Sequence, residues 1–328
     1  MRRFLPVLFA VAGAILAPAT PAFAHTGDTD GVSSYRVMVT GLSTPADGLS
    51  VRVVEGGARL ELRNDTGRAI EVLGYSGEPY LEIRPDGTYQ NVSSPAAYVN
   101  ETLNGDTPLP AGADPTLAPS WRKISSGTTA RWHDQRTQWR EAGLPAQAAA
   151  EPGREHRISE WVVPLRDQTR TFEIQGTLDY EPAPREWAWW AGAALLGVAV
   201  ALLAQRFPAS VRPVALFGGL TTMAYATTRA LDGGSWSGVL ILAGLLACAA
   251  SFRHPPFFLA LSGFVLAAFA GFGSADVFSA PVLPVVGPGW LARTAVLVAI
   301  GAGAGLALTG ILRLRAITPA PAQPAPQS

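Results

Sequence analysis

Residues 80–92 read YLEIRPDGTYQNV. Apolar and polar residues alternate on both sides of Pro85-Asp86-Gly87, and a turn sequence of this kind between alternating runs is typical of a β-hairpin. The same alternation recurs along the chain before and after the hairpin. Further predicted strands cover residues 34–40, 49–54, 59–63, 69–73, 121–125, 128–133, 158–165 and 171–180. Eight to ten short antiparallel strands predict an all-β, immunoglobulin-like sandwich over residues 25–184.

Two stretches between these strands have a different composition. Residues 93–119 are rich in Pro, Gly, Asn and Asp and predict a long loop, whereas residues 135–152 have room for a short helix.

The first 24 residues have the features of a secretory signal peptide. Arg2 and Arg3 are followed by an apolar run over residues 5–16, and Ala22-Phe23-Ala24 matches a cleavage site. We therefore expect the mature chain to begin at His25 and the sandwich to lie outside the cytoplasm.

Residues 185–315 are much more apolar than the sandwich and predict an all-α transmembrane domain. About twenty apolar residues cross a bilayer as a helix. Five runs of about that length lie at residues 187–204, 213–230, 236–252, 255–272 and 290–312. Pro281, Pro284 and Pro288 interrupt residues 273–289, which we expect to form a loop or a re-entrant segment. Residues 316–328 are rich in Pro, Ala and Gln, and predict a disordered tail.

Two independent signals predict the orientation of these helices. Arginines are concentrated in residues 205–212, 253–254 and 313–315, which the positive-inside rule places in the cytoplasm. Tryptophans 187, 189, 190, 236 and 290 open the spans that begin on the outer side. The sequence therefore predicts a multi-pass protein of the cell membrane with a cytoplasmic C-terminus.

Composition narrows the range of functions. The formal net charge is zero, so nothing suggests a nucleic-acid partner. Cys248 is the only cysteine, which leaves no intrachain disulfide. The five predicted spans contain no Asp, Glu, Lys or His, the residues that mark ion and proton pathways, and so favour an anchor over a pump. No recognisable catalytic motif is present, and we do not expect an enzyme.

Histidines are the strongest candidate metal ligands. An N-terminal His25 would offer its α-amine and its imidazole together, and a second imidazole from His133 would complete a three-nitrogen site suited to Cu(II). Asp134 is placed to orient His133. Asp28, Asp30 and Glu155 are weaker oxygen donors. The alternative is that His133 is a structural, hydrogen-bonded residue; His156 is expected to be exposed on a strand.

Two short blocks suggest a family. The blocks Val72–Tyr80 and Trp132–Trp139 (WHDQRTQW) resemble an uncharacterised family of actinobacterial membrane proteins with a signal peptide, a β-sandwich and several helices. In that family we expect the second block to read nearer W-H-D-H-R-x-H-W, so Gln135 and Gln138 replace two histidines. The overall plan more loosely resembles CopC-like and YcnI-like extracytoplasmic copper-handling proteins, a resemblance that implies copper as the ligand.

Three functional hypotheses follow. The first is a membrane-anchored extracytoplasmic binding or interaction protein, with copper as its leading ligand. The second is a structural or assembly protein, without a metal, that contacts another protein of the cell envelope. The third is a copper oxidase of the histidine-brace type. In each case the lipid bilayer is a partner.

Overall fold

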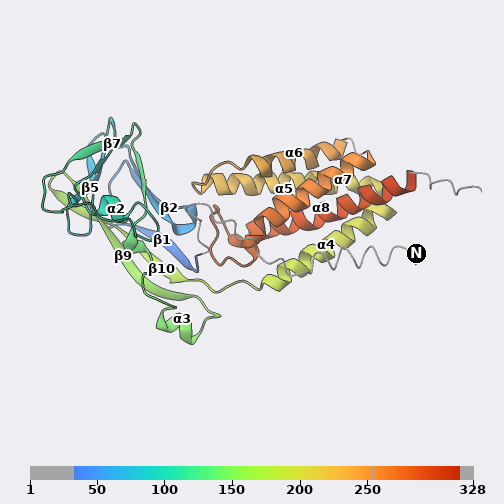
Figure 1. The fold of residues 1–328 in the computed structure, drawn as a ribbon, viewed down its shortest axis with the longest axis horizontal. Coiled ribbons are helices and arrows are strands. Elements are labelled where there is room, and N and C mark those ends of the chain that lie inside the picture. The colour runs from blue at the N-terminus through green and yellow to red at the C-terminus, as the bar shows by residue number, and fades with distance from the viewer. Residues whose placement is uncertain (1–32, 253–254, 318–328) are drawn as a thin grey trace, which may run out of the picture. The chain divides into compact units, whose positions relative to one another are not determined.

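The computed structural model describes residues 33–252 and 255–317, and these divide into two compact units. The sheet unit contains residues 33–183 and 280–284, and the helical unit contains residues 184–279 and 285–317. Figure 1 shows the strands and the helices gathered separately.

All ten predicted strands are present, with ends that differ from the prediction by two residues at most. Their bounds are β1 Tyr35–Leu42, β2 Leu49–Val54, β3 Arg59–Asn64, β4 Ile70–Leu73, β5 Pro79–Arg84, β6 Gly87–Asn91, β7 Trp121–Ser125, β8 Thr129–Trp132, β9 His156–Asp167 and β10 Arg170–Tyr180. The hairpin over residues 80–92 is confirmed: β5 and β6 pair antiparallel, with Ile83 opposite Thr88 and Arg84 opposite Gly87.

The strands form two antiparallel sheets. The larger sheet has seven strands in the order β1-β10-β9-β4-β5-β6-β7, and the smaller sheet has three in the order β2-β3-β8. Short helical segments join some of them: η1 Glu55–Gly57, α2 Ala96–Val99, η2 Gln135–Thr137 and α3 Ala146–Ala150. The predicted loop over residues 93–119 contains only α2, and α3 falls within the region expected to hold a short helix.

Both sheets contribute to one hydrophobic core. Leu60, Leu62 and Trp132 of the small sheet belong to the same buried cluster as Leu165 and Ile174 of the large sheet. Because side chains alternate between the two faces of a strand, the polar residues between these core positions must point away from the core. This alternation gives the small sheet a polar face on the side away from the core.

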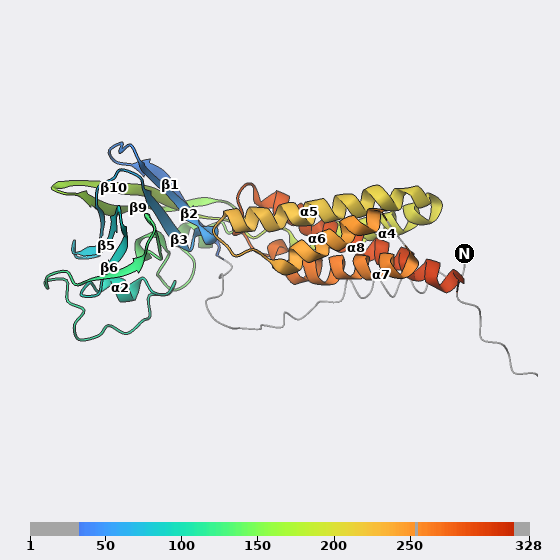
Figure 2. The ribbon, with the colours of Figure 1, turned by 90° about the horizontal axis from the view of Figure 1, so that it is seen from above.

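The helical unit contains α4 Glu186–Arg206, η3 Pro208–Ser210, α5 Val211–Leu231, α6 Gly238–Phe252, α7 Pro256–Val265, η4 Leu266–Gly271, η5 Phe272–Phe278 and α8 Gly289–Ile317. In Figures 1 and 2 the long helices α4, α5, α6, α7 and α8 run side by side. Two helix ends lie five or more residues beyond the prediction. Helix α8 ends at Ile317, where we expected the span to end at residue 312 and a disordered tail to begin at residue 316. The other difference concerns α7. We expected residues 273–278 in a loop, but α7 continues through a π-helical segment, η4, and a 3₁₀ segment, η5, as far as Phe278.

Within residues 33–252 and 255–317, three helices are able to cross a membrane by length and composition: residues 186–206, 256–278 and 289–317. Helix α6 is apolar but has only 15 residues. Helix α5 has 21 residues and carries Arg212 and Arg229 near its ends. It is not among the three.

Small residues line the interior of the bundle, and large apolar residues cover its exterior. A Cβ added at Gly263 would lie 2.4 Å from the backbone nitrogen of Ala307, and one at Gly303 would lie 2.6 Å from that of Ala267, so α7 and η4 approach α8 at backbone distance. The exposed side chains are of the opposite kind and include Leu195, Leu202, Phe217, Leu220, Leu242, Leu245, Phe257, Phe264 and Phe269. A water-soluble bundle has the reverse arrangement.

The core of the sheet unit leads to a stability prediction. We expect residues 25–184, secreted without the helices, to form a soluble domain that unfolds cooperatively. In that domain Leu165→Ala should lower the free energy of unfolding by about 2–5 kcal/mol, because Leu165 is fully buried and its truncation leaves a cavity. Chemical denaturation followed by circular dichroism measures the change. The matched variant Leu109→Ala, at an exposed leucine, should change it by less than about 0.5 kcal/mol. Equal effects would place Leu165 outside the core.

Candidate functional site

The outward face of the small sheet carries a concentration of arginines, which we call the arginine face. It consists of Ser50 and Arg52 on β2, Arg59, Glu61 and Arg63 on β3, and Thr129 and Arg131 on β8. These positions alternate with Val51, Val53, Leu60, Leu62 and Ala130, which pack in or against the core. Strand register then aligns them across the sheet: Arg52 lies opposite Glu61, and Glu61 lies opposite Arg131.

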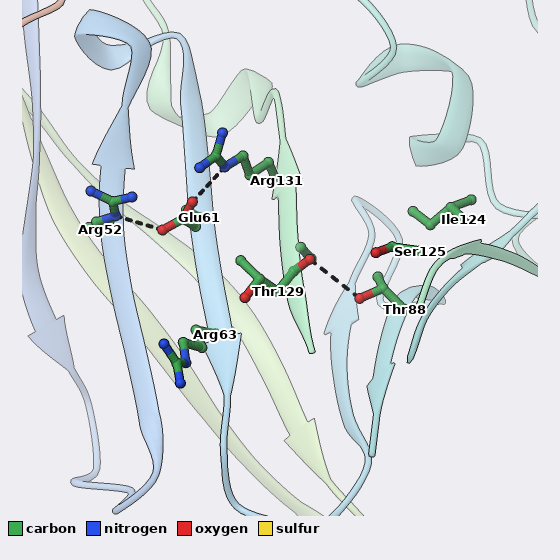
Figure 3. A pocket seen from close by; sticks show the side chains of 9 residues that line it. Arg52, Glu61, Arg63, Thr88, Ile124, Ser125, Thr129 and Arg131 are labelled. Atoms are coloured by element: carbon green, nitrogen blue, oxygen red, sulfur yellow. Dashed lines mark hydrogen bonds and ion pairs between the residues drawn. The ribbon is translucent and has the colours of Figure 1, made fainter. Parts of the chain in front are cut away.

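Glu61 is bound between two arginines. The Nε atom of Arg52 donates to Oε1 at 2.6 Å, and the Nε atom of Arg131 donates to Oε2 at 2.5 Å (Figure 3). Partial burial alone would raise the pKa of Glu61, but the hydrogen bonds and positive charges of the two arginines outweigh it and hold that pKa below its usual range. Glu61 is therefore ionised at neutral pH.

An open hollow of about 580 Å³ adjoins this triad. Figure 3 shows its walls, which come from the small sheet and from β6 and β7 of the large sheet. It is lined by Arg52, Glu61, Arg63, Thr88, Ile124, Ser125, Thr129, Ala130 and Arg131. The Thr88 hydroxyl donates to the Gly127 carbonyl at 2.9 Å and approaches the Thr129 carbonyl at 3.5 Å, which ties β6 to the start of β8.

His133 lies at the end of β8 and is 5% exposed. Its Nε2 atom accepts a hydrogen bond from Nε of Arg59 at 3.1 Å, and its Nδ1 atom lies 2.8 Å from the Ala58 carbonyl. Because Arg59 can only donate and a carbonyl can only accept, these bonds assign a neutral ring with its proton on Nδ1. Both ring nitrogens thus have partners in the sheet unit.

These contacts stabilise a turn with unusual backbone angles. Glu55, Gly56 and Gly57 all have positive φ, at 56°, 65° and 103°. A glutamate rarely adopts this conformation, and glycine is favoured at the two following positions. Arg59 forms an ion pair with Glu55 at 3.2 Å, and Nε2 of Gln138 donates to the Gly57 carbonyl at 2.9 Å. The segment after β8 therefore holds the turn after β2.

Asp134 belongs to a separate buried network. It is fully buried and accepts hydrogen bonds from Nε1 of Trp132 at 2.9 Å and from Arg136, whose Nη2 atom lies 2.7 Å from Oδ2. The Arg136 guanidinium also lies 4.9 Å from the centre of the Tyr75 ring. Burial, followed by the charge of Asp134, raises the pKa of Tyr75 to about 12, so this phenol stays protonated. We expected Asp134 to orient His133, whereas its hydrogen bonds hold Trp132 and Arg136.

The two glutamines of the WHDQRTQW block bind backbone carbonyls. Nε2 of Gln135 lies 3.2–3.3 Å from the carbonyls of Val99, Thr102 and Leu103, and Gln138 holds Gly57 as described above. The block thus ties two loops to β8. These contacts favour the structural interpretation of the block.

Of the predicted ligands other than His133 and Asp134, Glu155 alone lies in the described part of the chain. Nε2 of His156 lies 2.9 Å from the Glu151 carbonyl at the start of β9. His25, Asp28 and Asp30 lie outside the described residues. Across residues 33–252 and 255–317, no group of three or more His, Cys, Asp or Glu side chains is arranged to hold a metal ion.

Comparison of the chain with protein-family models, with curated proteins and with solved structures finds no match. The site must therefore be interpreted from its own geometry.

The sequence contained a signal for the arginine face that the prediction did not use. The polar positions of three alternating patterns are occupied largely by arginines. These are Arg52 in the pattern of β2, Arg59 and Arg63 beside Glu61 in that of β3, and Arg131 in that of β8. Strand prediction places these side chains on one face of each strand. It does not reveal that β8, about 65 residues further along the chain, pairs with β3.

The state of Glu61 leads to a pH prediction. Because the folded-state pKa of Glu61 is lowered, its contribution to stability is fully present above the usual pKa of a glutamate and is lost as pH falls through the folded value. Glu61→Gln should therefore lower the free energy of unfolding of the sheet domain by about 1 kcal/mol at pH 7. The difference should shrink below about pH 4. Urea unfolding at several pH values measures it.

The control for this experiment is Glu160→Gln, at an exposed glutamate on β9. We expect this substitution to change the free energy of unfolding little at any pH. A Glu61→Gln difference that is the same at pH 7 and pH 3 would show that the charge of Glu61 is not the stabilising component.

Proposed function

We propose that the chain is a membrane-anchored protein whose β-sheet domain lies outside the cytoplasm and serves as a binding or interaction module. The observation that carries this proposal is the packing of the helical unit. Its exterior exposes large apolar side chains and its interior is packed with glycine and alanine. In water an exposed apolar surface of this kind is strongly unfavourable, whereas lipid tails solvate it and close helix contact then depends on small residues.

We further propose that all five long helices span the bilayer. Helix α5 packs along α6 and α8, so it shares the bundle with the three apolar helices. Phe217 and Leu220 of α5 and Leu242 and Leu245 of α6 are exposed like the outer residues of α4. At 1.5 Å per residue, the 21 residues of α5 extend about 31 Å, which is the thickness of the hydrocarbon core. The 15 residues of α6 are too few to cross the full hydrocarbon core as a helix. This span therefore requires that the bilayer thins locally or that the residues flanking α6 complete the crossing.

The sequence supports one orientation for this anchor. A signal peptide over residues 1–24 would export the sheet domain, and the arginine-rich segments then fall on the cytoplasmic side. Within this proposal the sheet domain is an immunoglobulin-like sandwich. The supporting observation is that two antiparallel sheets share one core, divided here into seven and three strands.

Copper binding through His25 and His133 is a second candidate function. The observation in its favour is that His133 donates from Nδ1 to a backbone carbonyl, which is the bond that orients a metal-binding histidine and leaves Nε2 as the ligand atom. Copper would have to displace Arg59 from Nε2. Asp28 and Asp134 were the expected supporting residues, and Asp134 is already engaged by Arg136.

Two other hypotheses stay open as alternatives. A structural role, in which the sheet domain contacts an envelope protein, fits the use of the WHDQRTQW block to hold loops. A histidine-brace oxidase would need the same two histidines and, in addition, a substrate site beside them.

The five-span proposal predicts the location of its loops. A reporter fused after Arg253 should be cytoplasmic and one fused at Gly234 should be extracytoplasmic, because α6 would lie between them. Paired alkaline phosphatase and green fluorescent protein fusions measure both positions. If both reporters lie on the same side, α6 does not span and the count of five is wrong.

The copper hypothesis predicts that the mature chain starting at His25 binds Cu(II) tightly, with an affinity that falls as pH drops, because the nitrogen donors must lose their protons. Adding one residue before His25, or His133→Ala, should abolish the site. Arg59→Gln should strengthen it several-fold by releasing Nε2. Titration calorimetry and electron paramagnetic resonance are the measurements.

His156→Ala is the matched control for the copper experiment and should leave the affinity unchanged. If the extended chain binds copper as tightly as the mature one, His25 is not a ligand. The structural interpretation of His133 then stands.

A further inference from the structure

The helical unit separates its charges between its two ends. Its sequence contains only three acidic residues, which are Glu186, Asp232 and Asp276. Glu186 begins α4, and Asp276 lies in η5, whose backbone accepts a hydrogen bond from Nε of Arg293 near the start of α8. Asp232 directly follows α5, and the Thr228 carbonyl in the last turn of α5 accepts a hydrogen bond from the segment before α8. The three acids therefore share the end of the bundle at which α4 and α8 begin.

The opposite end of the bundle carries four arginines. We call it the basic end, and it consists of Arg206, Arg212, Arg313 and Arg315. A Cβ added at Gly192 would lie 2.9 Å from the Leu297 side chain. One added at Gly305 would lie 2.6 Å from the Val200 side chain, so α4 and α8 run in the same direction. Nη2 of Arg313 donates to the Ala204 carbonyl in the last turn of α4 at 3.2 Å, which joins the ends of the two helices.

Helix α5 begins at this same end. Val211, its first residue, belongs to one buried cluster with Ala204 of α4 and Leu306 of α8. Arg206 and Arg212 flank the short η3 connection between α4 and α5, and both residues are exposed. Two exposed guanidinium groups thus stand where one helix ends and the next begins.

Among the described residues, no carboxylate pairs with the basic end. The four arginines form no ion pair with Asp or Glu in residues 33–252 and 255–317. Their contacts are with the Phe207 ring, 5.0 Å from the Arg206 guanidinium, and with the Ala204 carbonyl. Like charges gathered in one place repel each other, and an anion bound beside them lowers this cost. At a membrane surface, clustered basic residues attract anionic lipid headgroups.

Exposed apolar side chains lie next to the basic end. Leu202 and Leu203 are in the last turns of α4, and Phe207 directly follows this helix. Phe217 lies within two turns of Arg212 on α5 and is also exposed. In a bilayer such side chains contact acyl chains. A ligand here therefore meets positive charge beside an apolar surface, a combination that suits a phospholipid better than a soluble anion.

We propose that the basic end binds an anionic phospholipid, with its phosphate at Arg206 and Arg212 and its acyl chains along α4 and α5. The inference rests on the proposed function, in which the helical unit spans the bilayer, and it names the class of lipid that the anchor selects. Arg313 adds its charge and also holds α4 against α8.

The test measures the affinity of the full-length protein, in a neutral detergent, for phosphatidylglycerol with a fluorophore on one acyl chain. Fluorescence anisotropy is the measurement, and phosphatidylcholine with the same chains and label is the control without net charge. We expect phosphatidylglycerol to bind at least tenfold more tightly. The preference should shrink as salt is added, because exposed charges are screened. Equal affinities for the two lipids overturn the proposal.

Variants then locate the site. Arg206→Gln and Arg212→Gln should each weaken phosphatidylglycerol binding about fivefold, the effect of one basic residue near an anionic membrane surface. Arg206→Lys should retain most of the affinity, because it keeps the charge. Arg229→Gln is the matched control, since Arg229 lies on the same helix as Arg212 but near its other end, close to Asp232, and it should have no effect. Binding that Arg206→Gln and Arg212→Gln leave unchanged contradicts the proposal.

A further arm separates a lipid from a soluble phosphate. Glycerol 3-phosphate carries a similar headgroup without acyl chains, and we expect it not to displace the labelled phosphatidylglycerol at equal concentration. Displacement would show that the site binds a soluble anion, and the lipid proposal would then be wrong. None of these outcomes affects the reporter experiment, which tests the membrane anchor separately.

Discussion

Asp134 has no exposure to solvent, and a buried carboxylate is tolerated only where donors and positive charge surround it. Trp132 and Arg136, two residues before and two residues after it, satisfy this requirement within five residues of chain. Their geometry fixes the path of residues 132–138. That path places Gln135 against one loop, and His133 and Gln138 against another. The contacts that join the segment after β8 to these two loops therefore depend on the neutralised charge of Asp134.

The same segment connects the buried network to the surface. Arg59 binds His133 at the edge of the arginine face, and Glu61 and Arg63 follow it on β3 at intervals of two residues. A surface site is precise only if its side chains are hydrogen-bonded to groups with fixed positions, because an exposed arginine otherwise samples many conformations. Here the support reaches Arg52 and Arg131 through Glu61.

Local patterns in the sequence were enough to predict each strand and each long helix. The alternation of polar and apolar residues located all ten strands. Eight of these strands place residues in or against the core, whereas β6 and β7 do not. The pairing of β3 with β8 was not predictable, since it joins segments about 65 residues apart and depends on the core as a whole. The partners of His133 were missed for the same reason. Arg59 is 74 residues away, and nothing in the local sequence indicates that it occupies Nε2.

The helical continuation to Phe278 was missed because Pro281, Pro284 and Pro288 led us to expect a loop or a re-entrant segment over the whole of residues 273–289. The π-helical segment from Leu266 to Gly271 has a consequence for the phase of the helix. Residues 263, 267 and 271 are spaced by four and all approach α8, through Ala307, Gly303 and Ile300. In an α-helix of 3.6 residues per turn a row with this spacing drifts steadily around the axis. A wider turn with i→i+5 hydrogen bonds takes up the excess and returns Gly271 to the same side. The π segment thus works as a phase correction that keeps a straight row of small residues against a straight neighbour.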